Sequence, residues 1–124
     1  MKTNKRTLGG AYERMALALA VQEGAEPVET NYRTAQGEID LIFKDGRYLV
    51  FAEVKYRAGS RFGSAEAAVD HRKQRTICRL ARAYLYRKRL GEDVPVRFDV
   101  FAISPDADGT DKVRWIRNAF QYHL

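Results

Sequence analysis

The clearest pattern in the chain is a pair of segments in which apolar and polar residues alternate, one on each side of the dipeptide Asp45-Gly46. Residues 37–44 and 47–57 alternate with a period of two, which is typical of β-strands. An Asp-Gly dipeptide between such segments is a strong signal for a two-residue hairpin turn. The sequence therefore predicts a β-hairpin, and a turn centred on this dipeptide fixes which residues face each other.

The two faces of this hairpin differ in character. One face is apolar apart from a tyrosine hydroxyl, so it is expected to pack on a core; it comprises Ile39, Leu41, Phe43, Tyr48, Val50, Ala52 and Val54. The other face comprises Glu38, Asp40, Ile42, Leu49, Phe51, Glu53 and Lys55. The expected register places Glu38 opposite Glu53, and like charges in that position destabilise a sheet. A divalent cation such as Mg²⁺, which takes oxygen ligands, removes this conflict. The alternative is that this second face is the solvated side of an amphipathic hairpin. Ile42, Leu49 and Phe51 count against that interpretation, because a solvated face would be uniformly polar.

The rest of the chain predicts helices and further strands around the hairpin. The expected elements are a helix over 10–23, a strand over 28–33, a short helical turn over 65–69, a long helix over 71–90 capped by Asp70, and strands over 96–103 and 113–118. This order predicts an α/β fold in which helices flank a mixed β-sheet.

Length and composition limit the other possibilities. A chain of 124 residues suits one domain, so we expect a basic disordered tail over 1–8 and a single domain over 9–124. The lone Cys78 excludes an internal disulfide and fits a reducing cytoplasm. No stretch approaches the length of a membrane span, which requires roughly 20 apolar residues. We therefore expect a cytoplasmic protein with no membrane partner.

Basic residues are concentrated in one part of the chain. Between Arg57 and Arg89, ten Lys or Arg residues face only Glu66 and Asp70, so this segment carries +8 while the whole chain carries +6. Within the long helix, four arginines lie opposite the side that Ile77, Leu80, Ala81 and Tyr84 are expected to bury. The predicted nucleic-acid contacts are Arg57, Arg61, Arg72, Lys73, Arg75, Arg79 and Arg82. The alternative is a solvated helix face, although such faces usually mix both signs of charge.

Aromatic side chains offer a second means of contacting nucleic acid. Tyr32, Tyr56, Phe62, Trp115 and Tyr122 are available for stacking, but core packing is the default expectation for each.

Several segments together resemble a known family. Asp40, followed by Glu53-Val54-Lys55, has the form of the PD-(D/E)xK motif of restriction-endonuclease-like nucleases, with Ile39 in place of the proline. The wider segments GEIDLIF, LVFAEVKYR, RFGSAEAAVDHRKQ and RFDVFAI resemble the YraN family of small bacterial predicted endonucleases. That family is similar to archaeal Holliday junction resolvases. The resemblance extends from about Gly10 to Asn118, and it implies a restriction-endonuclease-like αβββαβ core.

The resemblance also implies roles for individual residues. Asp40 and Glu53 are expected to bind Mg²⁺ or Mn²⁺, with the Val54 carbonyl as a further ligand. Lys55 is expected to orient a water molecule and to neutralise developing charge; the alternative is a surface lysine paired with Glu53. Glu38 is expected to bind a second metal or its water, unless it is simply a solubilising charge at a strand end.

Two further residues are candidates on the helices. Resolvase-like members of the superfamily often carry a glutamate in the first helix that reaches the metal through water, and Glu13 matches it; a solvated Glu13 is the alternative. Gln74 lies at the border of the buried side of the long helix, and Lys73-Gln74 matches a Lys-Gln pair of the YraN pattern. Gln74 is therefore a candidate catalytic residue, and the alternative is that it is simply a polar amide at the edge of the helix. No role follows from the sequence for Asp99.

These features together predict a Mg²⁺- or Mn²⁺-dependent endonuclease that hydrolyses DNA phosphodiester bonds. Branched DNA is the expected substrate by resemblance to the resolvases, and symmetric cutting of two strands requires a homodimer. Two other functions are open: a nuclease that acts on linear single-stranded DNA or RNA, and a non-catalytic DNA-binding module. The intact set of Asp40, Glu53 and Lys55 counts against the binding module, which needs no lysine beside clustered acids.

Overall fold

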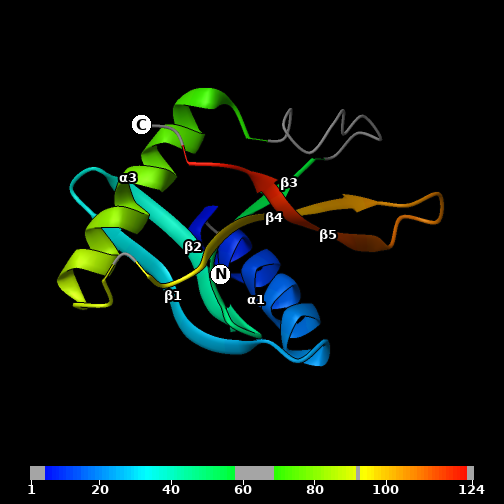
Figure 1. Ribbon diagram of the computed structural model, residues 1–124. Coiled ribbons are helices and arrows are strands. Elements are labelled where there is room, and N and C mark those ends of the chain that lie inside the picture. Colours follow the sequence, from blue (N-terminus) through cyan, green and yellow to red (C-terminus); the bar gives the residue numbers. More distant parts are fainter. Residues whose placement is uncertain (1–4, 58–68, 92, 123–124) are drawn as a thin grey trace.

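The structure, a computed structural model, describes residues 5–57, 69–91 and 93–122, with side chains from residue 10 onward. In chain order the elements are α1 (Lys5–Gln22), β1 (Glu26–Thr34), β2 (Gly37–Asp45), β3 (Tyr48–Tyr56), α3 (His71–Arg87), β4 (Val96–Pro105) and β5 (Asp111–Phe120) (Figure 1). The strands form one sheet in the order β1-β2-β3-β4-β5. Strands β3 and β4 are parallel and the other neighbours are antiparallel. The predicted mixed α/β fold with an αβββαβ core is confirmed.

Most element boundaries agree with the sequence prediction; one of the two helix starts agrees and the other differs. Helix α3 begins after Asp70, whose carboxylate accepts a hydrogen bond from the backbone N–H of Lys73 at 2.8 Å, as an N-cap does. Helix α1 begins at Lys5, inside the segment that we expected to be a tail. The expected turn over 65–69 lies almost entirely outside the described residues, as do Arg61 and Phe62. None of the described helices is long and apolar enough to cross a membrane.

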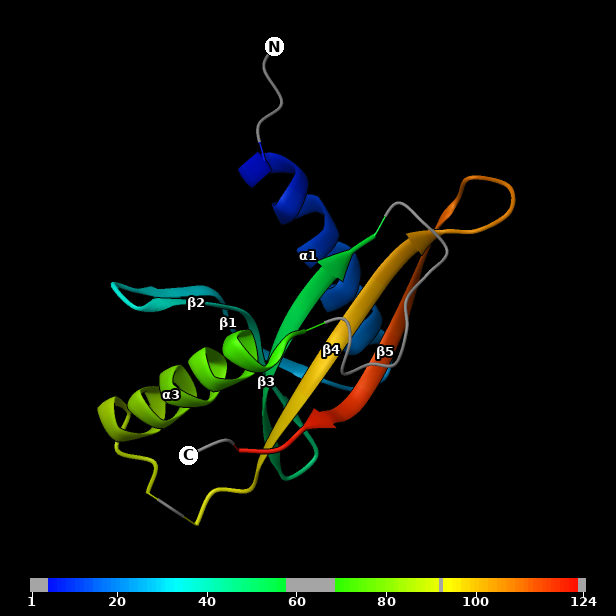
Figure 2. The same ribbon diagram turned by 90° about the horizontal axis from the view of Figure 1, so that it is seen from above.

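The two helices cover opposite faces of the sheet. Helix α3 packs Ile77, Leu80 and Tyr84 against a cluster that includes Phe51 and Phe98. Helix α1 packs on the other face; its contribution is Ala16 and Ala20, and the sheet contributes Leu41, Phe43, Val50 and Phe101. In Figure 2, α1 passes behind β3, β4 and β5. Both faces of the central strands are therefore buried, which agrees with the partly apolar second face of the predicted hairpin.

The hairpin register differs from the prediction by two residues. Asp45 pairs with Tyr48 and Ile42 pairs with Phe51, so Gly46 and Arg47 are the central turn residues. Gly46 has φ +61° and occupies the first central position, where type II′ turns place glycine. The expected opposition of Glu38 and Glu53 is therefore wrong. A shift of two leaves each side chain on its predicted face, because side chains alternate with period two.

Ile39 is a second correction, since it packs against α3 together with Tyr32 and not on the α1 face with Leu41. The β1–β2 ladder pairs Thr30 with Leu41 and Tyr32 with Ile39 but leaves out the residues between them. One of these is Asn31, which has φ +53°. We attribute the changed packing of Ile39 to this break in the ladder, which lies beside Asp40.

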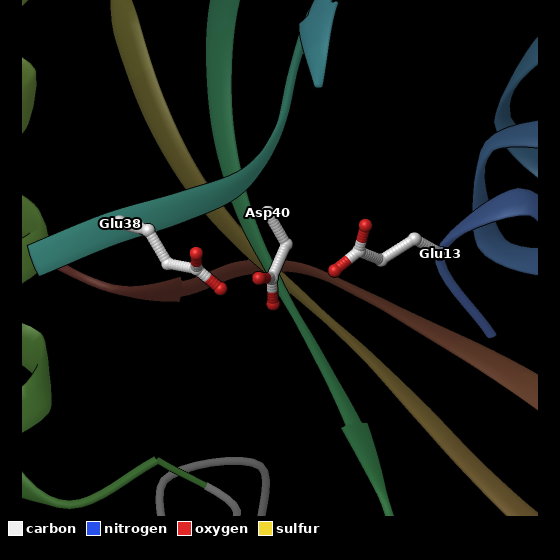
Figure 3. Close-up of side chains that lie close together, drawn as sticks. All are labelled: Glu13, Glu38 and Asp40. Carbon is white, nitrogen blue, oxygen red and sulfur yellow. The ribbon is translucent and has the colours of Figure 1, made fainter. Parts of the chain in front are cut away.

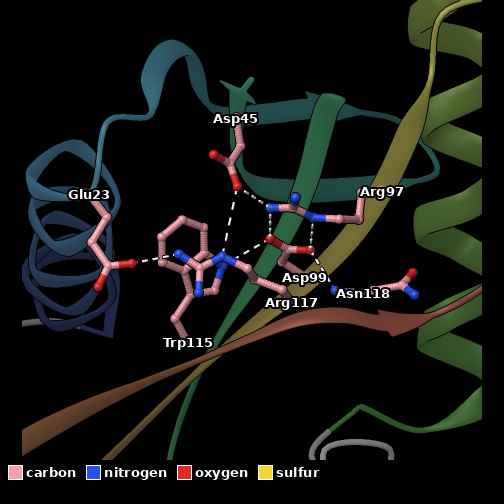
Figure 4. A network of polar contacts seen from close by, with 7 residues as sticks. All are labelled: Glu23, Asp45, Arg97, Asp99, Trp115, Arg117 and Asn118. Atoms are coloured by element: carbon pink, nitrogen blue, oxygen red, sulfur yellow. Dashed lines mark hydrogen bonds and ion pairs between the residues drawn. The ribbon is translucent and has the colours of Figure 1, made fainter. Parts of the chain in front are cut away.

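Asp99 belongs to a buried network that links β4 and β5 with the turn end of β2 (Figure 4). Its carboxylate is fully buried and accepts hydrogen bonds from the Arg97 guanidinium, from Trp115 Nε1 and from the Asn118 backbone N–H. Arg97 also bonds Asp45 at 2.7 Å, which ties β4 to the hairpin end. Every acceptor position of Asp99 is thus occupied by the protein, and its role is structural.

Candidate active site

Asp40 lies at the point where β2 and β3 separate. The two strands pair only as far as Leu41 with Ala52, after which β2 continues beside β1 and β3 continues beside β4. The Asp40 carboxylate occupies this gap, where its Oδ2 accepts a hydrogen bond from the Val54 N–H at 2.8 Å. The N–H and C=O groups of one strand residue face the same neighbour, so the Val54 carbonyl also faces the gap.

Glu53 lies beside Asp40 and is equally buried, with 7% of each residue exposed. Its Oε1 is 3.6 Å from Nζ of Lys73, which comes from the first turn of α3. Its Oε2 is buried and has no hydrogen-bond partner among the described residues. Lys55 lies two residues further along β3 and therefore on the same face. A buried carboxylate oxygen with no partner is costly, and a bound cation is one way to satisfy it.

Two more carboxylates converge on Asp40 from different elements. Figure 3 shows the Asp40 carboxylate between that of Glu13, from α1, and that of Glu38, from β2. One oxygen from each of the three carboxylates can be chosen so that all lie within 4.8 Å of one another. Glu38 also bonds Arg33 across the β1–β2 ladder, with Nε to Oε2 at 2.7 Å. The sequence-predicted Glu13, Glu38 and Asp40 are therefore brought together, although they come from distant parts of the chain.

The pKa values of Glu13, Asp40 and Glu53 are all raised. Burial and the charge of Asp40 raise the pKa of Glu13 to about 7, against a hydrogen bond from Asn31 that lowers it. Burial raises the pKa of Asp40, and the bond from the Val54 N–H opposes this shift. Burial and the charge of Asp40 raise the pKa of Glu53 well above its usual value, while Lys73 and Lys55 act in the opposite direction. The raised values mean that burial, with no cation bound, disfavours the charged forms of these three acids.

These side chains surround a hollow of about 250 Å³. Its lining comprises Tyr12, Glu13, Asp40, Glu53, Val54, Lys55 and Tyr56. Hard divalent cations prefer oxygen ligands, and this lining offers carboxylate oxygens, one of which has no hydrogen-bond partner among the residues that the structure describes. The donor set therefore fits Mg²⁺ or Mn²⁺, and a lysine stands at the same hollow.

The other sequence-predicted residues lie around this centre or apart from it. Gln74 is buried, and its Nε2 donates to the Val69 carbonyl at 2.9 Å, so it supports the start of α3 and does not line the hollow. Lys73, which the sequence assigned to DNA contact alone, pairs with Glu53. The remaining predicted contacts that the structure describes are exposed: Arg57, Arg72, Arg75, Arg79 and Arg82.

Three residues contact the site although the sequence did not predict a role for them there. Asn31 bonds Glu13, and its positive φ is one that asparagine adopts more readily than most residues. Arg33 pairs with Glu38, a contact that would have followed from treating β1 and β2 as a hairpin. Tyr12 lines the hollow and stacks on Tyr56, and its position one residue before Glu13 carried no signal of this contact.

The fold and the site define an α/β protein with an acidic centre between diverging strands. The family model described as "Uncharacterised protein family UPF0102" matches residues 12–103, and the chain belongs to this family, which is the YraN family. The UPF0102 protein STH1475 of Symbiobacterium thermophilum is 46% identical over 93% of this chain and 97% of its own length. The UPF0102 protein VP0448 of Vibrio parahaemolyticus is 39% identical over 94% of this chain and 93% of its own.

One solved structure with a similar chain trace is that of Pyrococcus furiosus SfsA in complex with Ca²⁺. The match has a TM-score of 0.42 and 15% identity, and it covers 92% of this chain and 64% of the other.

Proposed function

We propose that this protein is a divalent-metal-dependent nuclease that hydrolyses DNA phosphodiester bonds. The observation that carries the proposal is the pair of buried acids Asp40 and Glu53 beside Lys55, in which one carboxylate oxygen has no hydrogen-bond partner within the described part of the chain. A solvated surface cluster would leave such oxygens in contact with water. Clustered buried acids next to a lysine are suited to bind a cation and a phosphate together.

Four side chains would hold the metal. Asp40 and Glu53 are the proposed direct ligands, with the Val54 carbonyl facing the same gap. Glu13 and Glu38 flank the Asp40 carboxylate, where they would bind a second ion or the water around the first. When bound, Mg²⁺ or Mn²⁺ supplies Lewis acidity toward the phosphate and makes a water easier to deprotonate. Arg33 and Asn31 hold Glu38 and Glu13 in place.

The basic residues of the chain have separate tasks in this proposal. Lys55 donates hydrogen bonds to the attacking water or to a phosphate oxygen, and its charge offsets the negative charge that develops in the transition state. Lys73 keeps Glu53 oriented and ties the first turn of α3 to β3. Gln74 acts on the site indirectly, because its hydrogen bond to the Val69 carbonyl fixes the start of α3, which carries Lys73. The exposed arginines of α3 bind phosphates away from the cut, which positions the strand.

Branched DNA is the proposed substrate, by resemblance to the resolvases, and a homodimer is the proposed active form for paired cuts. The test is a cleavage panel of four-way junction, flap, single-stranded and duplex DNA, with Mg²⁺, Mn²⁺ or EDTA. We expect metal-dependent cleavage of the branched substrates by the wild type and none by Glu53→Gln. Cleavage of single strands alone, or of RNA in a parallel reaction, would favour the linear-strand nuclease. Binding of all substrates without cleavage of any would favour the binding module.

A further inference from the structure

Tyr12 and Tyr56 form a stacked aromatic pair at the hollow that holds the acids. Their ring centroids are 4.4 Å apart and their planes differ by 9°. Tyr12 comes from the middle of α1, and Tyr56 is the last residue of β3. Both rings line the same hollow as Asp40, Glu53 and Lys55. A flat aromatic surface therefore adjoins the proposed cleavage site.

This pair differs from the aromatic residues of the core. Phe43, Phe51 and Phe101 are fully buried, whereas 37% of Tyr56 is exposed. Tyr12 covers one face of the Tyr56 ring, so a further ring could stack on Tyr56 only from the opposite face. Exposed aromatic surface is unfavourable in water, and the sheet gains little from a ring at a strand end. The ring is thus available to another flat, apolar surface.

The residues on each side of Tyr56 add a second, independent indication. Lys55 and Arg57 are basic, and Arg57 is exposed. Proteins that bind single strands combine basic groups along the sugar-phosphate backbone with aromatic rings on which bases stack. Because β2 leaves β3 at Leu41, both faces of this end of β3 border the same hollow, although Lys55 and Tyr56 point to opposite faces.

We infer that Tyr56, supported by Tyr12, stacks on an unpaired base next to the phosphate that is cut. This inference rests on the proposed nuclease function and narrows its substrate to DNA with at least one unpaired nucleotide at the cleavage position. In a continuous duplex each base is already stacked on both sides, so no base is free to lie on Tyr56. Single strands, flaps and the open centre of a branch provide one.

The test is a binding titration in Ca²⁺, with a short single strand that carries one 2-aminopurine and with the matching duplex. Stacking on tyrosine quenches 2-aminopurine, so the wild type is expected to quench the single strand. Tyr56→Ala should bind that strand roughly tenfold more weakly and lose the quenching, while its duplex affinity is unchanged. Tyr56→Phe should retain both properties because it keeps the ring. Tyr86→Ala, which removes an exposed tyrosine of α3, should behave as wild type.

The results separate this inference from the proposed function. Equal losses of single-strand and duplex affinity in Tyr56→Ala, or undiminished quenching, would overturn the stacking role even if the protein cuts DNA. Quenching that depends on Tyr56, in a protein that cuts none of the panel substrates, would support the stacking role and contradict the nuclease. If Tyr56→Ala does not fold, as judged by its melting curve, Tyr56→Leu replaces it, with the same expected losses relative to Tyr56→Phe.

Discussion

Nζ of Lys73 lies 3.6 Å from Oε1 of Glu53, and this ion pair joins the first turn of α3 to the centre of the acidic site. The lysine side chain is 40% exposed and the glutamate side chain only 9%. The pair therefore compensates a buried charge from the solvent side. It also places the start of the arginine-bearing helix next to the acids.

Replacing Lys73 removes the partner of a buried carboxylate. We expect Lys73→Gln to lower the free energy of unfolding by about 1 kcal/mol without metal, because half of the pair is solvent-screened. The difference should shrink in saturating Mg²⁺, which would compensate Glu53 instead. Urea unfolding with and without Mg²⁺ measures both values. Arg72→Gln, one position away and exposed, should change stability by less than about 0.5 kcal/mol; an equal effect of the two variants would contradict the pairing.

The arginines of α3 should contribute to DNA affinity through charge alone. We expect the triple variant Arg75→Ala, Arg79→Ala, Arg82→Ala to bind all DNA sequences more weakly. Each lost phosphate contact should reduce the slope of log K against log salt by roughly one. The slope is measured from binding isotherms at several salt concentrations, in Ca²⁺.

A matched triple variant controls for net charge. Lys44→Ala, Arg47→Ala and Arg114→Ala remove the same charge from exposed positions away from α3. This control should keep nearly the full salt slope. If both triple variants reduce the salt slope equally, the arginines of α3 do not contact DNA specifically and are simply solvated.

Glu13 should make the stability of the metal-free protein fall as the pH rises. Its pKa is raised from 4.5 to about 7, so the folded protein holds this proton more tightly than the unfolded chain does. The resulting stabilisation is complete below pH 4.5 and is lost as the pH rises through about 7. Melting temperatures in EDTA across this range should fall for the wild type and fall less for Glu13→Gln. Asp40 and Glu53, also raised, account for the remaining fall.

Glu26→Gln is the control for this titration, because Glu26 is exposed at the start of β1. Its pH profile should follow that of the wild type. A Glu13→Gln profile that coincides with the wild type would mean that Glu13 does not sense the acidic cluster.

Asp99 should matter for stability and not for metal binding. Asp99→Asn leaves the 12%-exposed Arg97 side chain without its main buried counter-charge, so we expect a loss of about 3 kcal/mol in urea unfolding. The rise in melting temperature on adding Mg²⁺ should stay as in the wild type. A loss of that rise would place Asp99 in the metal site; Asp93→Asn, at an exposed position, serves as the neutral control.

The sequence predicts the elements well because their signals are local. Alternation in the hairpin, the Asp70 cap and the buried stripe of the long helix each depend on neighbouring residues, and each agrees with the structure. Apart from Ile39, the hairpin faces also agree, since the error in register was an even number of residues. Asp45-Gly46 and Gly46-Arg47 are both plausible two-residue turns, and nothing local distinguishes them.

The contacts that build the site depend on distant segments and could not be read in the same way. The bond from Val54 to Asp40 exists because β2 leaves β3, a separation that no local pattern encodes. Lys73 reaches Glu53 only because α3 crosses back over the sheet. The family resemblance marked Asp40, Glu53 and Lys55, but the stacking of Tyr12 on Tyr56 required the packed helix.

The central claim is that Asp40 and its neighbours bind a divalent cation, and thermal unfolding against Mg²⁺ concentration tests it without any knowledge of the substrate. The wild type should be stabilised by about 2.7 kcal/mol at a hundredfold excess of Mg²⁺ over its dissociation constant. Asp40→Asn should melt no lower than the wild type in EDTA, because a repulsive charge is gone, and should not respond to Mg²⁺. A melting temperature that rises equally in both proteins, or in neither, would contradict the account.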